Sequence, residues 1–224
     1  MSSPIHIPSR RLFLASAAIP LFTVRGAFAN LIEDLTKTPA QTEGPFYPNK
    51  LPLDTDNDLI VINEGITPAV GEITHLTGKI LDAKGNPVKN ALVEIWQCDA
   101  KGVYLHTADS GQKKDQQDKH FQGFGRCLTA RSGGYYFRTI QPVPYPGRTP
   151  HIHVAVKRGK KELLVTQLYI AGHAQNEKDF VWLGVKDKKQ RDSITVEFAK
   201  LKDSKIGELA ATFDIILGKT PEVD

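Results

Sequence analysis

The chain has 224 residues, of which 40% are hydrophobic and 24% are charged. That composition is ordinary for a globular protein and is enough for one domain with a substantial core, or for two small ones. The net charge of +4 falls to 4 − 3 = +1 without residues 1–29, which hold three arginines and no acid. A chain so close to neutral gives no reason to expect a nucleic acid or an anionic membrane surface as a partner.

Residues 1–29 are typical of an export signal. Arg10 and Arg11 precede an apolar run at residues 12–24, and small residues end the segment at Ala29. This arrangement resembles a twin-arginine leader, and the apolar run is shorter than the ~20 residues that a membrane-spanning helix needs. We therefore expect cleavage after Ala29 and a periplasmic or secreted protein, which N-terminal sequencing of the exported chain would show. An uncleaved anchor and a general secretory signal are the alternatives.

The elements predicted after the leader are mostly β-strands. Residues 30–41 form a short, weakly helical lead-in, and two prolines favour an extended chain at residues 43–48. The rest of the chain alternates short runs rich in β-branched and aromatic residues with turns rich in Gly, Asp, Asn and Pro. These runs predict strands at residues 73–81, 91–97, 127–130, 135–140, 151–157, 162–170, 193–198 and 212–217.

Turns and loops complete the pattern. Residues 158–160 predict a hairpin, residues 111–119 predict an exposed polar loop, and helix is limited to about residues 176–180 and the lead-in. Frequent turns between short strands are typical of all-β folds. We expect residues 30–224 to form a mainly β, single-domain antiparallel β-sandwich with long loops and little helix, a closed barrel being the alternative. No segment after the leader is apolar enough to span a membrane.

Cys98 and Cys127 are the two cysteines, too few for a disulfide scaffold. An oxidising compartment would permit one bond between them, and two separate buried thiols are the commoner arrangement. The sequence leaves both open.

Two histidines separated by one residue, His151 and His153, form the first candidate site. On a strand they project to the same face with Cα atoms roughly 7 Å apart, a spacing that lets both side chains bind one metal ion. A pair of hydrogen-bonded surface histidines would have the same pattern. The other histidines after the leader lack this geometry and are expected at the surface: His75, His106, His120 and His173.

Further ligands of such a metal would have to come from outside the pair. Lys157 and Arg158 occupy the places where a cupin-type glutamate would lie, and no cysteine is near enough for a zinc-finger pattern. Tyrosine is what remains, because a phenolate is a hard anionic oxygen donor whose pKa of ~10 must be lowered by the metal itself. Such a ligand fits Fe(III) better than Zn(II) or Cu(I).

Several short motifs follow one another along the chain: GPFYP (44–48), IWQ (95–97), GVY (102–104), PYP (144–146), RTPHIH (148–153) and QLY (167–169). In this order they resemble the intradiol ring-cleaving dioxygenases, over about residues 42–198. The resemblance implies an enzyme with one non-haem Fe(III) per chain, which opens a catechol-type diol between its two hydroxyls with O2 and forms a muconate-type diacid. Its partners would be small molecules, the diol and O2.

The resemblance also implies roles for single residues. The iron ligands would be two tyrosines and two histidines: Tyr104, Tyr145, His151 and His153. Tyr145 would leave the iron and take a proton when the diol arrives, and Arg148 and Gln167 would act beside the reacting ring. Tyr47 and Arg148 are candidates for binding the substrate. The remaining aromatic residues of interest are expected to pack the sandwich: Trp96, Tyr135 and Tyr136.

Two departures from the family bear on substrate and assembly. Tyr145 and His151 are only 151 − 145 = 6 residues apart, a shorter loop than in the catechol and protocatechuate enzymes. A shorter loop predicts a site that is more open, or one whose contacts with the substrate point in a different direction. The N-terminal helical dimerisation segment of catechol 1,2-dioxygenases has no room here. The chain therefore looks like a protocatechuate-type subunit, present as a homo-oligomer or with a second kind of subunit. Protocatechuate, catechol and hydroxyquinol all stay open as substrates.

Two other functions stay open on the sequence alone. The strand–turn–strand pattern of residues 78–96 also fits a non-catalytic β-sandwich module that binds carbohydrate or peptide. His151 and His153 would also serve a zinc or copper enzyme. An iron–tyrosinate protein would be red-brown, whereas the alternatives would be colourless or blue.

Overall fold

The computed structural model describes residues 35–221, apart from residues 64, 112 and 114. The chain divides into two units, Met1–Glu33 and Asp34–Asp224, and every described residue belongs to the second. The predicted leader and its cleavage site lie outside the described residues, so the expected export stays a prediction. Within the described part, no helix has the length and apolar character needed to cross a membrane.

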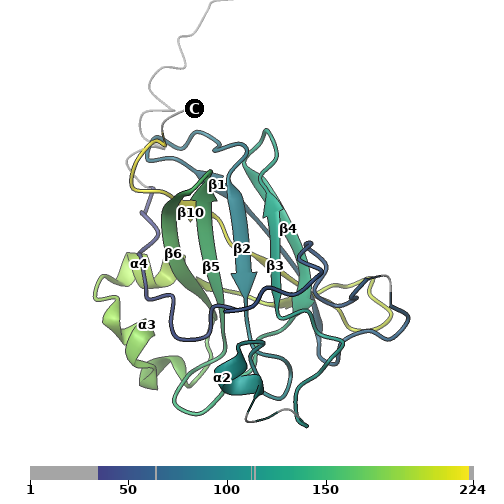
Figure 1. Cartoon of the computed structure of the whole chain (residues 1–224). Helices are drawn as coiled ribbons and strands as arrows, with labels where there is room; N and C mark the ends of the chain where they lie inside the picture. The colour runs from purple at the N-terminus through teal and green to yellow at the C-terminus, as the bar shows by residue number, and fades with distance from the viewer. Residues whose placement is uncertain (1–34, 64, 112, 114, 222–224) are drawn as a thin grey trace, which may run out of the picture. The chain divides into compact units, whose positions relative to one another are not determined.

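Two five-stranded β-sheets make up the described unit (Figure 1). The first sheet contains β1 (Ile73–Leu81), β4 (Gly134–Ile140), β8 (Ala199–Lys200), β9 (Leu209–Thr212) and β10 (Ile215–Ile216). The second has the order β3 (Phe124–Leu128), β2 (Leu92–Trp96), β5 (His151–Arg158), β6 (Lys161–Ile170) and β7 (Thr195–Val196). Apolar side chains of both sheets share one buried core, so the predicted mainly β sandwich is confirmed.

The longer strands pair antiparallel, whereas the short C-terminal strands add parallel pairs, so both sheets are mixed. β9 and β10 run parallel to β1, and β7 runs parallel to β6. Parallel neighbours need a long connection, which usually contains a helix. The connection from β6 to β7 meets that need with η1 (Asn176–Lys178), α3 (Phe180–Gly184) and α4 (Lys188–Ser193).

The predicted elements and the observed ones differ mainly in short segments. Residues 193–198 pair only at β7, and residues 212–217 are divided between the end of β9 and β10. The hairpin at residues 158–160 joins β5 to β6, and the described part of segment 111–119 is a loop, although its Asp118 is buried. The sequence does not predict α2 (Thr107–Ser110) or α4, because helices of 4 and 6 residues are too short to show an amphipathic period.

Three side-chain predictions have clear outcomes. Trp96 and Tyr135 are buried as predicted. Tyr136 does not pack the core, because alternation along β4 turns it outward, where it is 39% exposed and its hydroxyl lies 2.8 Å from His75 Nδ1. Cys98 and Cys127 are both free thiols in the structure.

β5 is buried on both faces, and its two faces have different surroundings. Its residues Ile152, Val154 and Val156 join the core between the sheets. Alternation places His151 and His153 on the opposite face. A second, smaller cluster covers that face, here called the outer cluster: Trp96, Cys98, Tyr104, Phe124, Ala155 and Val165. The paired histidines therefore lie on the outer face of the second sheet.

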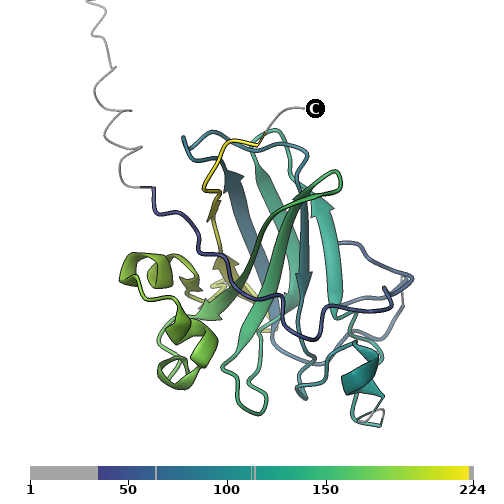
Figure 2. The ribbon, with the colours of Figure 1, turned by 60° about the vertical axis from the view of Figure 1, so that its left-hand side comes forward.

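Residues 38–48, here called the N-terminal strap, run across this outer face (Figure 2). The backbone of the strap is hydrogen-bonded to β10 at Thr38 and to β6 at Gln41. Phe46 and Tyr47 of the strap pack against the outer cluster. The strap therefore covers the part of the sheet where the paired histidines lie.

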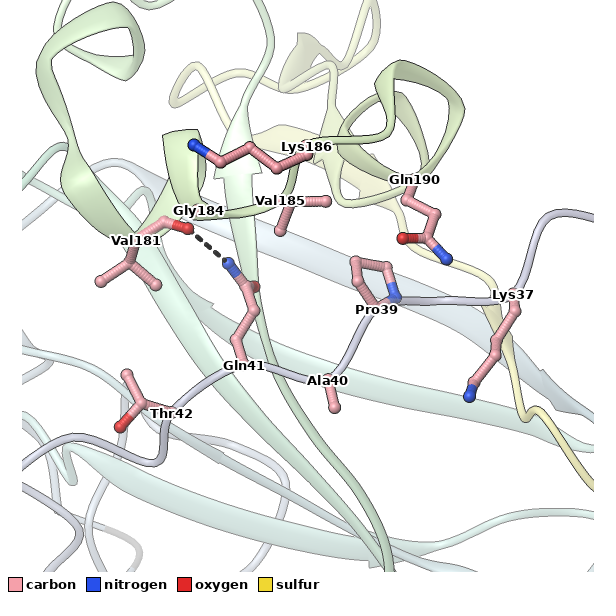
Figure 3. Close-up of a pocket in the computed structure, with 10 residues that line it drawn as sticks. All are labelled: Lys37, Pro39, Ala40, Gln41, Thr42, Val181, Gly184, Val185, Lys186 and Gln190. Carbon is pink, nitrogen blue, oxygen red and sulfur yellow. Dashed lines mark hydrogen bonds between the residues drawn. The ribbon is translucent and has the colours of Figure 1, made fainter.

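The predicted helical lead-in is wrong where the structure describes it. Residues 35–41 contain no helix, because pairing with two strands outweighs a weak helix propensity. On its other side the strap borders α3 and α4, and a surface hollow of about 570 Å³ lies between them (Figure 3). The walls of the hollow include Gln41 and Thr42, which are both hydrogen-bonded to Gln167 on β6.

Candidate metal centre

The two histidine rings on β5 converge at their Nε2 atoms, with 72° between the ring planes. His151 and His153 are each 1% exposed, and their Nε2 atoms are 3.2 Å apart. Burial lowers the pKa of His151 to about 4 and holds the pKa of His153 well below its ordinary value, so both rings are neutral at pH 7. His151 Nδ1 lies 2.6 Å from Thr149 O, which assigns its proton to Nδ1 and leaves a lone pair on Nε2. Such converging imidazole nitrogens suit a shared metal ion.

Tyr104 supplies a third donor from the loop that follows β2. Its hydroxyl is 3.3 Å from His151 Nε2, and the residue is 2% exposed. Two carboxylates shape the loop: Asp99 accepts two of its backbone N–H groups, and Asp109 accepts from Tyr104 N at 2.8 Å. Burial raises the pKa of Tyr104 well above its ordinary value. A bound cation would therefore be needed to make this phenol an anion at neutral pH.

Tyr145 lies in the turn that precedes β5 and is less enclosed than Tyr104. Its ring centroid is 5.5 Å from that of Tyr104 and 5.5 Å from that of His151. Arg148 N donates to Tyr145 O at 2.9 Å, and Gly147 takes the positive φ of 82° that the turn requires. Burial raises the pKa of Tyr145, and the positive charge of Arg148 partly offsets that rise. The Tyr104 phenol is thus enclosed, whereas the Tyr145 phenol is half-buried beside the Arg148 guanidinium.

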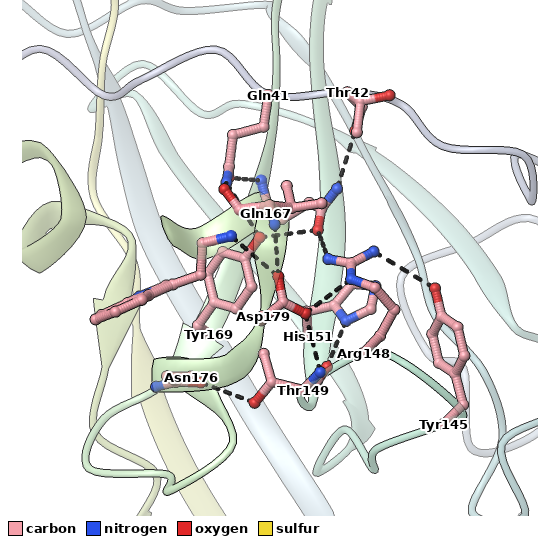
Figure 4. Close-up of polar contacts among 12 residues, drawn as sticks. Gln41, Thr42, Tyr145, Arg148, Thr149, His151, Gln167, Tyr169, Asn176 and Asp179 are labelled. Carbon is pink, nitrogen blue, oxygen red and sulfur yellow. Dashed lines mark hydrogen bonds and ion pairs between the residues drawn. The ribbon is translucent and has the colours of Figure 1, made fainter. Parts of the chain in front are cut away.

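Arg148 is held by a buried carboxylate that the sequence did not reveal (Figure 4). Its Nε donates to Asp179 Oδ2 at 2.8 Å, and its Nη2 donates to Gln167 Oε1 at 2.6 Å. Its Nη1 lies 3.5 Å from Tyr145 Oη. Burial alone would raise the pKa of Asp179, but hydrogen bonds from Arg148 and from backbone N–H groups hold it below its ordinary value. The guanidinium is therefore charged, and its position beside Tyr145 is fixed.

Asp179 could not be identified from the sequence, because it contacts a residue that is distant from it in the chain. Its Oδ1 accepts from the backbone N–H groups of Val181 and Trp182 at the start of α3, and its Oδ2 also accepts from Thr149 N. From the sequence, an aspartate at this place indicates only a helix N-cap. Arg148 is 31 residues away, and no local pattern connects the two residues.

Gln167 joins Arg148 to the N-terminal strap (Figure 4). It is the cross-strand partner of His153, so its side chain lies on the same face of the sheet. Its Oε1 accepts from Arg148 and from Tyr169 Oη, and its Nε2 donates to Thr42 O at 2.9 Å. The structure therefore brings together two of the residues that the sequence suggested for catalysis.

Tyr47 lies on the same face and contacts a second ion pair, in which Glu94 is buried and Lys157 is half-buried. Its hydroxyl donates to Glu94 Oε2 at 3.0 Å, and Lys157 Nζ lies 2.6 Å from the same oxygen. Sequence reasoning missed this pair as well. The predicted contact between Tyr47 and a substrate stays a prediction. Of the histidines expected at the surface, His120 is exposed. The other three are half-buried: His75, His106 and His173.

A small cavity lies beside the half-buried phenol and the guanidinium. Its volume is about 160 Å³. Its lining consists of Tyr145, Gly147, Arg148, Thr149, Gln175, Lys178 and Asp179. The larger hollow of Figure 3 contains none of the four candidate ligands. Of these two hollows, only the small cavity is lined by a candidate ligand, Tyr145.

The donor types decide which metal the centre fits. Among the described residues, no group of three or more His, Cys, Asp or Glu side chains could hold a metal ion. A metal bound by His151 and His153 therefore needs ligands of another type, and Tyr104 and Tyr145 are in position to supply phenol oxygens. Two imidazoles and two phenols suit Fe(III), a hard and strongly Lewis-acidic cation. The residues present fit iron(III).

Sequence comparisons identify the family to which the chain belongs. A family model described as Dioxygenase matches residues 42–219, more than half of the chain. The beta chain of protocatechuate 3,4-dioxygenase from Burkholderia cepacia is 36% identical over 176 residues, which cover 74% of this chain and 72% of that protein. Hydroxyquinol 1,2-dioxygenase from Corynebacterium glutamicum is 30% identical over 67% of this chain and 52% of its own length, so this chain spans about half of that relative.

A solved structure extends the agreement to the fold. The dioxygenase domain of a dioxygenase–carbohydrate-binding protein fusion from Streptomyces sp. SirexAA-E superposes with a TM-score of 0.61 at 26% identity, covering 83% of this chain and 100% of that domain. Fold, family match and relatives lead to one conclusion: this chain is a member of the intradiol ring-cleaving dioxygenases, oxidoreductases that open catechol-type diols with O2.

Proposed function

We propose that this chain binds one iron(III) ion and cleaves a catechol between its two hydroxyls with O2. The ligands would be Tyr104, Tyr145, His151 and His153. The observation that carries the proposal is the convergence of buried donors, because Tyr104 Oη and His153 Nε2 both lie within 3.3 Å of His151 Nε2. Iron(III) held there would act as a Lewis acid that chelates both diol oxygens and makes the ring reactive towards O2, with a muconate-type diacid as the product.

Tyr145 is the residue that we assign to proton transfer. Its side chain lines the small cavity from which a diol would arrive. Burial raises its pKa, so a Tyr145 phenolate that gives up its place in the centre is a good base. Tyr145 Oη would accept one proton from the arriving diol. The residue is then neutral, the form that burial favours.

Arg148 supplies a positive charge that does not have to move during the reaction. Asp179 and Gln167 fix its guanidinium, and its Nη1 lies 3.5 Å from Tyr145 Oη, where the diol would replace the phenol. A pre-positioned charge stabilises negative charge that develops in the transition state without reorganisation. This is the role in catalysis that we assign to Arg148.

The N-terminal strap closes the outer side of the centre. Phe46 stacks on Tyr104 with ring centroids 4.8 Å apart and 20° between the ring planes. A Cβ atom built at Gly44 would lie 3.3 Å from His153 Cε1, so the strap backbone also approaches the second histidine. Excluding water at these points strengthens the electrostatic interactions inside the centre.

The proposal also covers the identity of the diol and the subunits with which the chain assembles. One relative is named for protocatechuate and another for hydroxyquinol, so we propose a catechol-type diol of this range, catechol included. The protocatechuate relative is named as a beta chain. A second kind of subunit is therefore one proposed assembly, and a homo-oligomer is the other.

The purified single chain, reconstituted with iron(III), tests the proposal. We expect one iron per chain, a red-brown colour from the phenolate ligands, and O2 uptake with at least one of protocatechuate, catechol and hydroxyquinol. The zinc-loaded chain should be colourless and inactive. Uptake by the single chain would show that no second kind of subunit is required. A chain that stays colourless and takes up no iron under these conditions would contradict the proposed centre.

A further inference from the structure

The two histidines of the centre are held in different ways. His151 has a hydrogen-bonded second nitrogen, since its Nδ1 lies 2.6 Å from Thr149 O. His153 Nδ1 is buried and has no hydrogen-bond partner among the described residues. Histidines that bind metals almost always donate their second N–H group to a carboxylate, a carbonyl or water, which fixes the ring. Something other than a hydrogen bond must therefore orient the ring of His153.

Two close contacts replace the missing hydrogen bond. Trp96, the cross-strand partner of His153 on β2, stacks on the imidazole with ring centroids 4.8 Å apart and only 11° between the planes. Gly44 of the strap approaches the same ring, because a Cβ atom there would lie 3.3 Å from His153 Cε1. That separation is closer than most Cβ contacts in proteins, so the glycine has no spare room beside the ring.

The indole of Trp96 is itself held by packing. Trp96 is 0% exposed, and its Nε1 has no hydrogen-bond partner among the described residues. The ring of Tyr47 packs edge-on against it, with centroids 5.0 Å apart and planes at 80°. The Tyr47 hydroxyl is in turn fixed by Glu94 and Lys157, whose ion pair measures 2.6 Å. Glu94 precedes Trp96 by two residues on β2, so both lie on the outer face.

We propose that Trp96 and Gly44 are positioning residues for the metal ligand His153. The stacked indole and the close strap backbone set the angle at which His153 Nε2 meets the metal, and Tyr47 with its ion pair keeps the indole in place. The inference deepens the proposed function, because it takes His153 as an iron ligand. It also predicts that His153 is the less firmly held of the two histidines, since a stack restrains a ring less sharply than a hydrogen bond does.

The first test compares Trp96→Leu with Phe124→Leu in iron-loaded protein. Phe124 belongs to the same cluster, is 0% exposed and touches Tyr47, but it has no ring contact with His153. Loss of a residue that orients a metal ligand typically costs 10- to 100-fold in metal affinity. We therefore expect Trp96→Leu to release iron to a chelator roughly tenfold to a hundredfold faster than the parent and to shift the visible band. Phe124→Leu should release iron at nearly the parent rate.

Trp96→Phe should restore much of the iron retention, because a smaller aromatic ring can still stack on the imidazole. Melting curves of the metal-free variants separate loss of folding from loss of iron, since Trp96→Leu and Phe124→Leu both remove large buried rings. Equal iron release from Trp96→Leu and Phe124→Leu would overturn the proposal, and so would a Trp96→Leu protein that holds iron like the parent.

A second pair of variants tests the strap and does not depend on a large change in the core. Gly44 and Gly207 have nearly the same φ, 75° and 80°, so alanine strains the backbone alike at both positions. A Cβ atom at Gly44 meets His153, whereas a Cβ atom at Gly207 has nothing within 4 Å. We expect Gly44→Ala to speed iron release about tenfold and Gly207→Ala to leave it unchanged. Equal rates for the two variants would contradict the role of Gly44.

The parent protein distinguishes this inference from the proposed function. If the parent takes up no iron, the proposed centre itself is wrong. If the parent binds iron, and Trp96→Leu and Gly44→Ala retain it as well as Phe124→Leu and Gly207→Ala do, the centre stands and only the positioning roles of Trp96 and Gly44 fall.

Discussion

Tyr104→Phe should lose most of its iron and lower kcat by about a thousandfold. The side chain is almost fully enclosed, its hydroxyl lies 3.3 Å from His151 Nε2, and Asp109 fixes its backbone, so the change removes an oxygen donor that is held in place beside the histidines. Lewis-acid stabilisation is worth several kcal/mol, and each ~1.4 kcal/mol corresponds to a factor of ten in rate. Iron content and single-turnover rates on the reconstituted variant measure both effects.

Tyr145→Phe should behave differently, because Tyr145 is only half-buried and lines the small cavity. We expect this variant to keep part of its iron, to shift the visible band, and to slow the binding of the diol more than the later reaction with O2. Stopped-flow spectra taken first without O2 and then with O2 separate the two phases.

Tyr135→Phe is a matched control for both variants. Tyr135 is a buried tyrosine in the core between the sheets, and its hydroxyl donates to Phe213 O, so the change again removes one buried phenol oxygen. Its iron content and kcat should equal those of the parent. If Tyr104→Phe and Tyr145→Phe bind iron and diol as this control does, neither tyrosine is a ligand.

Arg148→Ala should keep its iron and its colour and lower kcat about a hundredfold. One positioned charge donor is typically worth roughly 3 kcal/mol in the transition state. The variant should also melt at a lower temperature, because the change leaves Asp179 without its buried partner. Asp179 would still accept from the backbone N–H groups of Thr149, Val181 and Trp182, so we expect the variant to fold.

Asp179→Asn is the matched variant that separates charge from position. Asparagine is also a good N-cap, so α3 should be retained, while the carboxylate that fixes the guanidinium is lost. We expect a fall in kcat of roughly tenfold, smaller than for Arg148→Ala, because the positive charge stays in the cavity but is less well placed. An Arg148→Ala variant as active as the parent would restrict Arg148 to a structural role as the partner of Asp179.

The sequence predicts the part of the site that depends on local geometry. Because side chains alternate along a strand, His151 and His153 had to share a face, and the structure places both on the outer face of β5. The resemblance to a family, rather than spacing, indicated Tyr104 and Tyr145. The structure then brings both phenol rings close to His151.

The parts that the sequence did not predict depend on contacts between distant segments. Asp179 reaches Arg148 only because the connection from β6 to β7 returns to the turn that precedes β5. Residues 35–41 are not helical. A short helix leaves the backbone N–H and C=O groups at its ends without partners, whereas here Thr38 N and Gln41 N donate hydrogen bonds to β10 and β6. Glu94 and Lys157 lie on neighbouring strands, and their pairing follows from a register that only the structure gives.

Product analysis with ¹⁸O2 tests the central claim most directly. The iron-loaded chain is supplied with the diol that it consumes fastest, and the product is examined by mass spectrometry and NMR. We expect one O2 to be consumed per ring, both oxygen atoms to enter the product, and the ring to be opened between the two hydroxyl-bearing carbons to give a muconate-type diacid. A ring opened beside the two hydroxyls rather than between them, or a diol merely oxidised to a quinone, would contradict the account.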